Sequence, residues 1–165
     1  GGDVDIMKYS WGLDKYYSFI EKHVLELSFD IGTIQRYSDT TRVPIFERYF
    51  AGGTNLRGFG FRQVGPRDAA GNPIGGNSIV LGSAEYSFPL YRDVIRGAVF
   101  YDTGNVEEDD FTWNFGDLVS GAGVGVRVKT PFGPMKLDYA WVLEKDSRDP
   151  DADSARWHFG VGKLF

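Results

Sequence analysis

The sequence contains no cysteine and only two histidines, His23 and His158. Without cysteine there is no disulfide scaffold, no thiol nucleophile and no thiolate metal site. The sequence also lacks a Gly-x-Ser-x-Gly elbow, a His-Glu-x-x-His pair and a phosphate-binding loop between strand and helix. We therefore expect a protein that is not an enzyme and that binds neither a cofactor nor a metal ion.

An excess of basic residues is missing as well. Lysine and arginine number 18 against 23 aspartates and glutamates, and the formal net charge is −5. Because affinity for nucleic acid depends on neutralising phosphates, this balance argues against a nucleic-acid partner. No stretch approaches the roughly 18 consecutive apolar residues that a membrane helix needs, which excludes a helical membrane protein.

Aromatic residues make up 16% of the sequence, and glycine occurs 22 times. This composition is typical of an all-β protein. Long stretches alternate between apolar and polar residues, as strands with two different faces do. In the segment 122–129 one face carries valines, whereas the other carries glycine, Arg127 and Lys129. This second face is not an ordinary protein core. The alternation predicts about seven strands, at residues 4–19, 25–32, 80–88, 96–106, 122–129, 135–144 and 155–165.

Strand length and loop asymmetry point to an antiparallel transmembrane β-barrel. Most predicted strands have ten residues or more, whereas a tilted strand needs about 9 to 11 to cross a bilayer. Tight turns are expected near 90–95 and 130–133, and long loops at 37–77, 107–117 and 145–155. Short turns at one end and long loops at the other are typical of outer-membrane barrels. The loop 37–77 is long enough that a function is expected for it.

Several motifs resemble those of the BamA superfamily, the outer-membrane assembly and translocation barrels. Arg57-Gly58-Phe59 in the long loop is similar to the family's Arg-Gly-Phe signature, with Leu56 in place of a β-branched residue. Gly82-Ser83-Ala84-Glu85 resembles its Gly-x-x-Glu strand, and Phe100-Tyr101-Asp102-Thr103-Gly104 its Phe-x-Asp-x-Gly strand. Residues 133–138 are similar to the turn and strand that follow. The four motifs stand in family order between residues 46 and 165.

The resemblance implies that residues 1–165 are the C-terminal part of an outer-membrane barrel domain, about half of a BamA-type barrel, with seven or eight strands and no POTRA domain. It implies an integral protein of the bacterial outer membrane that folds and inserts other outer-membrane proteins by strand templating at a barrel seam. The implied partners are client outer-membrane proteins, lipid or lipopolysaccharide, accessory assembly lipoproteins, and the remaining barrel strands or a second copy. A pore for polypeptides or solutes, gated by the long loop, stays open as an alternative. A soluble β-barrel or β-sandwich binding module is a third.

A latch inside the barrel is expected from the charges. Glu85 and Asp102 share the interior face of their strands and need a cation in a polar lumen. Arg57 can supply it, because its planar fork suits carboxylates, while Gly58 allows a tight turn. Phe59 is expected to pack on the inner wall near Phe100. The alternative is that Arg57 is a solvated cation and that the two carboxylates merely line a wet lumen.

Two further expectations concern the end of the chain and the acidic loop. Trp157, Phe159, Val161 and Phe165 form an apolar face that resembles the C-terminal β-signal of outer-membrane proteins. The run 107–110 is expected to be solvated charge without a metal site. An odd number of strands does not close an up-and-down bacterial barrel, so either an eighth strand is present or the sheet pairs with further chain.

Overall fold

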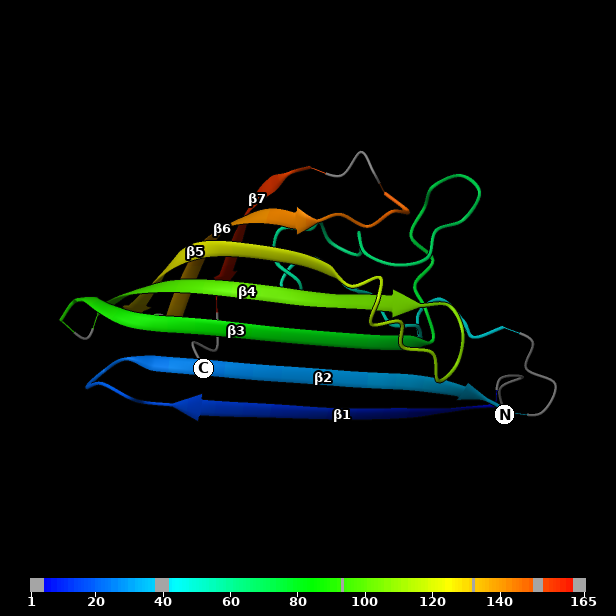
Figure 1. The fold of residues 1–165 in the computed structure, drawn as a ribbon, viewed down its shortest axis with the longest axis horizontal. Helices are drawn as coiled ribbons and strands as arrows, with labels where there is room; N and C mark the ends of the chain where they lie inside the picture. Colours follow the sequence, from blue (N-terminus) through cyan, green and yellow to red (C-terminus); the bar gives the residue numbers. More distant parts are fainter. Residues whose placement is uncertain (1–4, 38–41, 93, 132, 150–152, 162–165) are drawn as a thin grey trace.

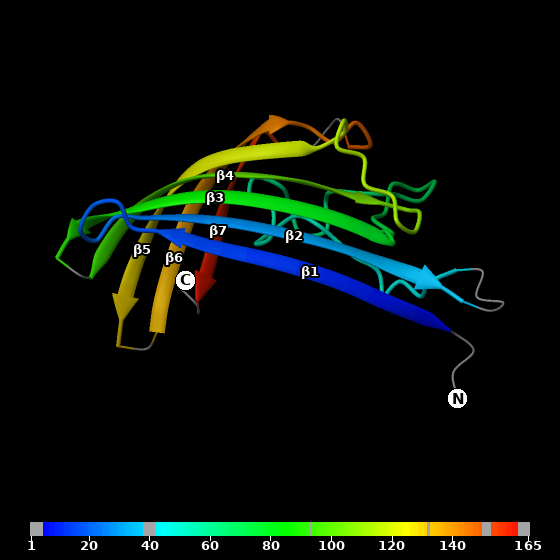
Figure 2. The same cartoon turned by 60° about the horizontal axis from the view of Figure 1, so that its bottom comes forward.

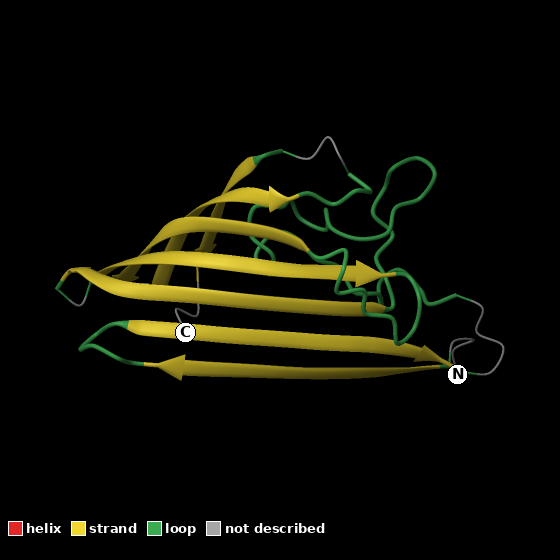
Figure 3. Cartoon of the chain, in the orientation of Figure 1, coloured by secondary structure: helices red, strands yellow, loops and turns green. Residues whose placement is uncertain are grey.

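The computed structural model describes residues 5–37, 42–92, 94–131, 133–149 and 153–161. These residues form seven β-strands and no helix (Figure 3). The strands are β1 (Ile6–Tyr17), β2 (Val24–Arg36), β3 (Ser78–Tyr91), β4 (Ile95–Glu107), β5 (Val119–Thr130), β6 (Gly133–Glu144) and β7 (Ala155–Val161). None of the described segments is a helix long and apolar enough to cross a membrane.

The strands form one antiparallel sheet in sequence order, from β1 to β7 (Figure 1). The predicted strand count is confirmed. The strands β2 to β6 extend beyond one or both of their predicted ends, whereas β1 ends at Tyr17, two residues before its predicted end. Figure 2 shows that β5, β6 and β7 bend away from β1–β4, so that the sheet forms a trough with a concave and a convex side. Within the described part of the chain, β1 and β7 each pair on one side only, and the sheet stays open.

Strand register assigns side chains to the two sides of the trough. Glu85 of β3 lies opposite Phe100 of β4, and Ser83 lies opposite Asp102, so these four side chains share the concave side. Valines and aromatic rings of the alternate positions face the convex side, where Val124, Leu137 and Phe159 are exposed. The strands are therefore apolar outside and polar inside, as in a membrane barrel.

The connections differ at the two ends of the sheet. The chain turns within a few residues between β3 and β4 and between β5 and β6, whereas long loops follow β2, β4 and β6 at the opposite end (Figure 1). The segment after β2, coloured cyan to green, lies on the concave side of the trough (Figures 1 and 2). The fold thus positions one long loop against the polar face of the strands.

Candidate functional site

The site begins with the tip of the loop 37–77, which is closed by its own backbone. The N–H of Gly53 donates to the carbonyl of Phe59 at 3.0 Å, and the N–H of Val64 donates to the carbonyl of Ala51 at 3.1 Å. Gly58 at the tip has φ +100°, a conformation that favours glycine. The tip is consequently an ordered turn that presents Arg57 in a defined direction.

Apolar packing fixes the tip to the wall. Leu56 and Phe59 are fully buried, and they pack with residues of three strands. The cluster consists of Ala51, Leu56, Phe59 and Val64 from the loop and Ile79, Val106 and Val119 from the wall. Phe59 therefore lies against the inner wall within this cluster, while Phe100 makes a different contact, with Arg57 itself.

Arg57 is bound by Asp102 through both sides of its guanidinium. Nε lies 2.7 Å from Oδ2 and Nη2 lies 2.8 Å from Oδ1, and the backbone N–H of Arg57 donates to Oδ2 at 3.0 Å. Nη1 donates to Glu85 at 2.5 Å, and the guanidinium carbon lies 3.5 Å from the ring centre of Phe100. Arg57 is 6% exposed and Asp102 2%. The sequence-predicted residues Arg57, Glu85, Phe100 and Asp102 are thus brought into one cluster.

The electrostatics of this cluster favour the charged form of Arg57. Burial by itself would lower the pKa of Arg57, but its hydrogen bonds to Asp102 and the charges of Asp102 and Glu85 raise that pKa above its ordinary value. The guanidinium therefore stays protonated although water is almost excluded. A bidentate, buried pair of this kind is far stronger than a surface ion pair.

A second arginine, which the sequence analysis did not single out, completes the cluster. Arg127 of β5 donates to Glu85 through Nη2 at 2.7 Å and through Nε at 3.1 Å, and it also donates to the buried Asp138 of β6. Arg57 reaches Asp138 at 3.5 Å. Two guanidiniums thus pair with three carboxylates in a nearly dry site, which leaves one carboxylate charge in excess. We call Arg57, Glu85, Asp102, Arg127 and Asp138 the lumen ion cluster.

Glycines on the inner face of β5 make room for the loop. A Cβ on Gly121 would collide with the carbonyl oxygen of Arg57, and one on Gly123 would collide with the ring of Phe100. The space over this glycine-rich face is occupied by the loop tip and by the Phe100 ring, which lies under the Arg57 guanidinium. Close approach of the loop backbone to β5 accounts for these glycines.

The loop tip also reaches the last described strand. The backbone N–H of Gly58 donates to Nε2 of His158 in β7 at 2.9 Å. Because Nε2 accepts this bond, the ring proton of the neutral imidazole is on Nδ1. The other predicted residues of this strand, Trp157, Phe159 and Val161, point to the convex side and are exposed, and Phe165 lies outside the described residues.

The two other long loops hold the first one in place. Asp146, after β6, accepts a 2.9 Å hydrogen bond from the N–H of Gly65, and Asp149 binds Arg67 at 2.5 Å. Asp110, after β4, binds Arg36 at 3.1 Å and accepts from Asn77 at 2.8 Å. The expectation that the run 107–110 is only solvated charge is therefore wrong for Asp110. It fails because this carboxylate links the two ends of the long loop.

Within the described residues no group of three or more histidine, cysteine or acidic side chains is arranged to hold a metal ion. The carboxylates of the lumen ion cluster are instead paired with arginine. The arrangement can fasten a loop to a wall; it offers no activated nucleophile and no acid–base pair aimed at open space.

Comparison with known proteins decides the family. The model of the Omp85 superfamily domain matches residues 1–165, the whole chain. The chain belongs to the Omp85 superfamily. The resemblance to BamA-type barrels that the motifs indicate is thereby confirmed, and with it an all-β outer-membrane barrel fold.

Two curated relatives show the range of the superfamily. The outer membrane protein assembly factor BamA of Nitratidesulfovibrio vulgaris is 30% identical over 100% of this chain and 21% of its own length. The chloroplastic outer envelope protein 80 of Arabidopsis thaliana is 36% identical over 70% of this chain and 15% of its own length. The chain therefore spans between about a seventh and a fifth of the length of these two relatives. Like the BamA relative, it belongs to the outer membrane.

A solved structure supports the fold. The crystal structure of BamA from Haemophilus ducreyi lacking POTRA domains 1–3 superposes with a TM-score of 0.80 at 22% identity, covering 95% of this chain and 35% of that one. At this identity the likeness concerns the fold alone. The trough of seven strands corresponds to part of a larger barrel wall.

Proposed function

We propose that this chain is the C-terminal part of a barrel that assists the folding and insertion of other outer-membrane proteins. The matched BamA proteins are outer membrane protein assembly factors, which supports this role. The observation that carries the proposal is the link from the lumen ion cluster through Gly58 to His158 in β7. It connects the inner loop with the strand whose free edge is open.

Strand templating follows from that edge. Within the described residues, β7 pairs with β6 on one side, and its other side presents unpaired backbone donors and acceptors. An incoming client strand can pair with such an edge by β-augmentation. The role is non-enzymatic, because backbone pairing needs no catalytic group. In the intact barrel, strands preceding β1 or a second copy would supply the other lip of the seam.

We propose that the loop residues Arg57, Gly58 and Phe59 act as a latch together with Glu85, Phe100 and Asp102. The contacts of Arg57 with these three wall residues support this role. We infer that the latch holds the wall in shape while the edge of β7 exchanges partners. Further partners in this proposal are client proteins, outer-membrane lipid or lipopolysaccharide, and accessory assembly lipoproteins.

Disulfide cross-linking tests the template directly, because the chain has no cysteine of its own. Single cysteines at Arg156, Trp157, His158 and Phe159 would be combined with single cysteines along the last strand of a small client barrel during its insertion into vesicles. A template predicts cross-links in one register, since disulfides need Cα atoms within about 7 Å. Val124→Cys in the middle of the sheet is the matched control. Templating would be refuted if the cysteines in β7 formed no cross-links with the client strand or formed them without a preferred register. It would also be refuted if they cross-linked no more strongly than the cysteine at position 124.

The alternative function is a pore gated by the long loop, and the position of that loop inside the trough favours it. Conductance across a planar bilayer separates the two functions. A pore predicts that Arg57→Ala raises conductance while client cross-linking at β7 is unchanged. Unchanged conductance with lost cross-linking would favour assembly.

A further inference from the structure

The loop between β4 and β5, residues 108–118, lies on the convex side of the sheet. Ser78 of β3 is an odd number of residues from Glu85 and so faces away from the lumen. Its hydroxyl donates to the carbonyl of Asp109 at 2.8 Å and accepts from the N–H of Thr112 at 3.2 Å. The N–H of Phe111 donates to the hydroxyl of Thr33 on the same outer face at 2.9 Å. The loop is therefore bonded to the outside of the wall.

This loop carries three aromatic residues at alternate positions. The ring of Phe111 lies 6.1 Å from that of Tyr9 on the outer face of β1 and 6.2 Å from that of Trp113. Phe111 is 51% exposed and Phe115 60%. Phe111 has φ +52°, a conformation that a bulky residue seldom adopts and that the bond to Thr33 helps to hold. The local structure thus keeps large rings at the surface.

The rings continue a band that already faces lipid. Exposed aromatic residues of the convex side lie near the loop end of their strands in β1, β6 and β7: Tyr9, Trp141 and Trp157. Contact between Phe111 and Tyr9 joins the loop to this band. Aromatic rings of outer-membrane barrels gather at the height of the lipid headgroups.

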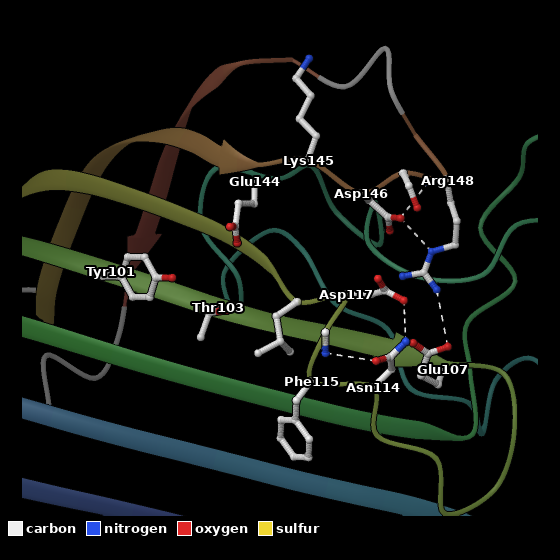
Figure 4. Close-up of a pocket in the computed structure, with 13 residues that line it drawn as sticks. Tyr101, Thr103, Glu107, Asn114, Phe115, Asp117, Glu144, Lys145, Asp146 and Arg148 are labelled. Carbon is white, nitrogen blue, oxygen red and sulfur yellow. Dashed lines mark hydrogen bonds and ion pairs between the residues drawn. The ribbon is translucent and has the colours of Figure 1, made fainter.

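A cavity of about 680 Å³ adjoins the aromatic loop on the same side. Tyr101 and Thr103 of the outer face line it, together with Asn114, Asp117 and Glu144 (Figure 4). The Phe115 ring extends away from these polar side chains in the close-up. Polar groups beside a projecting aromatic ring match the boundary between headgroups and acyl chains.

We propose that the loop 108–118 is a membrane-interface anchor, whose partner is the headgroup layer of the outer membrane and whose contacts are Phe111, Trp113 and Phe115. The loop folds down onto the wall, and its rings enter the lipid boundary beside the strands. This inference rests on membership of an outer-membrane barrel family, and it is independent of whether the barrel assembles proteins or conducts solutes.

Site-specific labelling tests the anchor in the full chain reconstituted in phosphatidylcholine vesicles. Phe115→Cys would be labelled with an environment-sensitive fluorophore, with Phe111→Cys as a second position should the first variant fold poorly. Leu13→Cys on the outer face of β1 is the lipid-facing control, and Phe61→Cys in the loop 37–77 is the aqueous control, because Phe61 is 78% exposed. Quenching by a lipid with a nitroxide near its headgroup is compared with quenching by iodide in water.

An anchor predicts that the lipid quencher acts on the Phe115 label about as strongly as on the Leu13 label and several-fold more than on the Phe61 label, with weaker quenching by iodide. A Phe115 label quenched like the Phe61 label would overturn the proposal. Protection from both quenchers would also overturn it, because protein and not lipid would then cover the loop.

Discussion

Gly58 at the tip of the long loop and His158 in β7 are joined by a hydrogen bond of 2.9 Å across 100 residues of sequence. It is the backbone N–H of Gly58 that donates, so the contact depends on an acceptor at position 158 and on the shape of the tip. The loop and β7 are thereby linked by a hydrogen bond from the backbone of one to a side chain of the other.

Replacing His158 tests this link. His158→Ala removes the acceptor, and we expect faster hydrogen exchange of the Gly58 amide by about tenfold, corresponding to a hydrogen bond of about 1.4 kcal/mol. His158→Gln retains an acceptor oxygen and should keep most of the protection. The control is His23→Ala, since His23 lies in the turn between β1 and β2 and binds Tyr86. Equal protection in all four proteins would show that the bond carries no stability.

Loss of Arg57 should destabilise the folded barrel strongly. Arg57→Ala leaves Asp102 buried without its cation, and removing one partner of a buried ion pair costs about 3–5 kcal/mol. Urea unfolding in detergent and heat-modifiability on gels measure the effect. Arg62→Ala, at an exposed arginine of the same loop, is the control. Glu85→Gln combined with Asp102→Asn should loosen the loop as well, and unchanged heat-modifiability in all these variants would contradict the latch.

Arg127 should matter as much as Arg57, although no family motif points to it. Arg127→Met would leave Asp138 and Glu85 short of one cation in a buried site, and we expect a loss of about 3 kcal/mol or more. Lys129→Met on the same face of β5 is exposed and should change stability by less than about 0.5 kcal/mol. A smaller effect at Arg127 than at Lys129 would show that the ion pairs of Arg127 do not stabilise the barrel.

Space at Gly121 should be required for the loop to dock. In Gly121→Ala the new methyl group would meet the carbonyl oxygen of Arg57, so the tip must move away from β5. We expect faster proteolysis of the loop 37–77 at neutral pH. Gly82→Ala is matched, because its methyl group would meet only the Thr103 side chain at 3.5 Å, an ordinary contact. Identical digestion of the two variants would mean that the tip is not held against β5.

Acid should weaken the contact between the loops at Asp146. Burial alone would raise the pKa of Asp146, but hydrogen bonds from the Arg148 side chain and from the backbone N–H groups of Gly65 and Arg148 lower it below its ordinary value. A lowered folded-state pKa gives stability that is fully present above the unfolded pKa of about 3.9 and is lost as pH falls through the lower value. Asp146→Asn should therefore reduce the dependence of unfolding free energy on pH below about 5.

The sequence predicts the wall well, because alternation and strand length are local properties. It also predicts that Glu85 and Asp102 both face the lumen, because alternate residues of a strand lie on the same face of the sheet. It further predicts that Arg57 can reach these two carboxylates. The same alternation, applied to β5 and β6, places Arg127 and Asp138 on the lumen face. The cationic face of the segment 122–129 is the sequence signal from which their role could have been predicted. The bond from Gly58 to His158 has no such signal, because a backbone amide donates from every residue type except proline.

The loop contacts mark the limit of sequence reasoning more clearly. Asp110 lies in an acidic run that has the composition of a solvated loop, yet it binds Arg36 and Asn77. Asp146 binds Gly65 across 81 residues. These pairs depend on how the three long loops fold against one another, and no local pattern fixes that arrangement.

Residues of five strands, β3 to β7, contact the same two loop residues, and this arrangement has an evolutionary consequence. Arg57 and Gly58 contact Glu85, Asp102, Gly121, Asp138 and His158, one residue from each of these strands. Substitutions among groups in direct contact are not additive, so the effect of a change at one position depends on the residues at the others. We therefore expect substitutions at these positions to be tolerated only in combination with one another. The outward-facing valines of β5, in contrast, can be replaced one at a time.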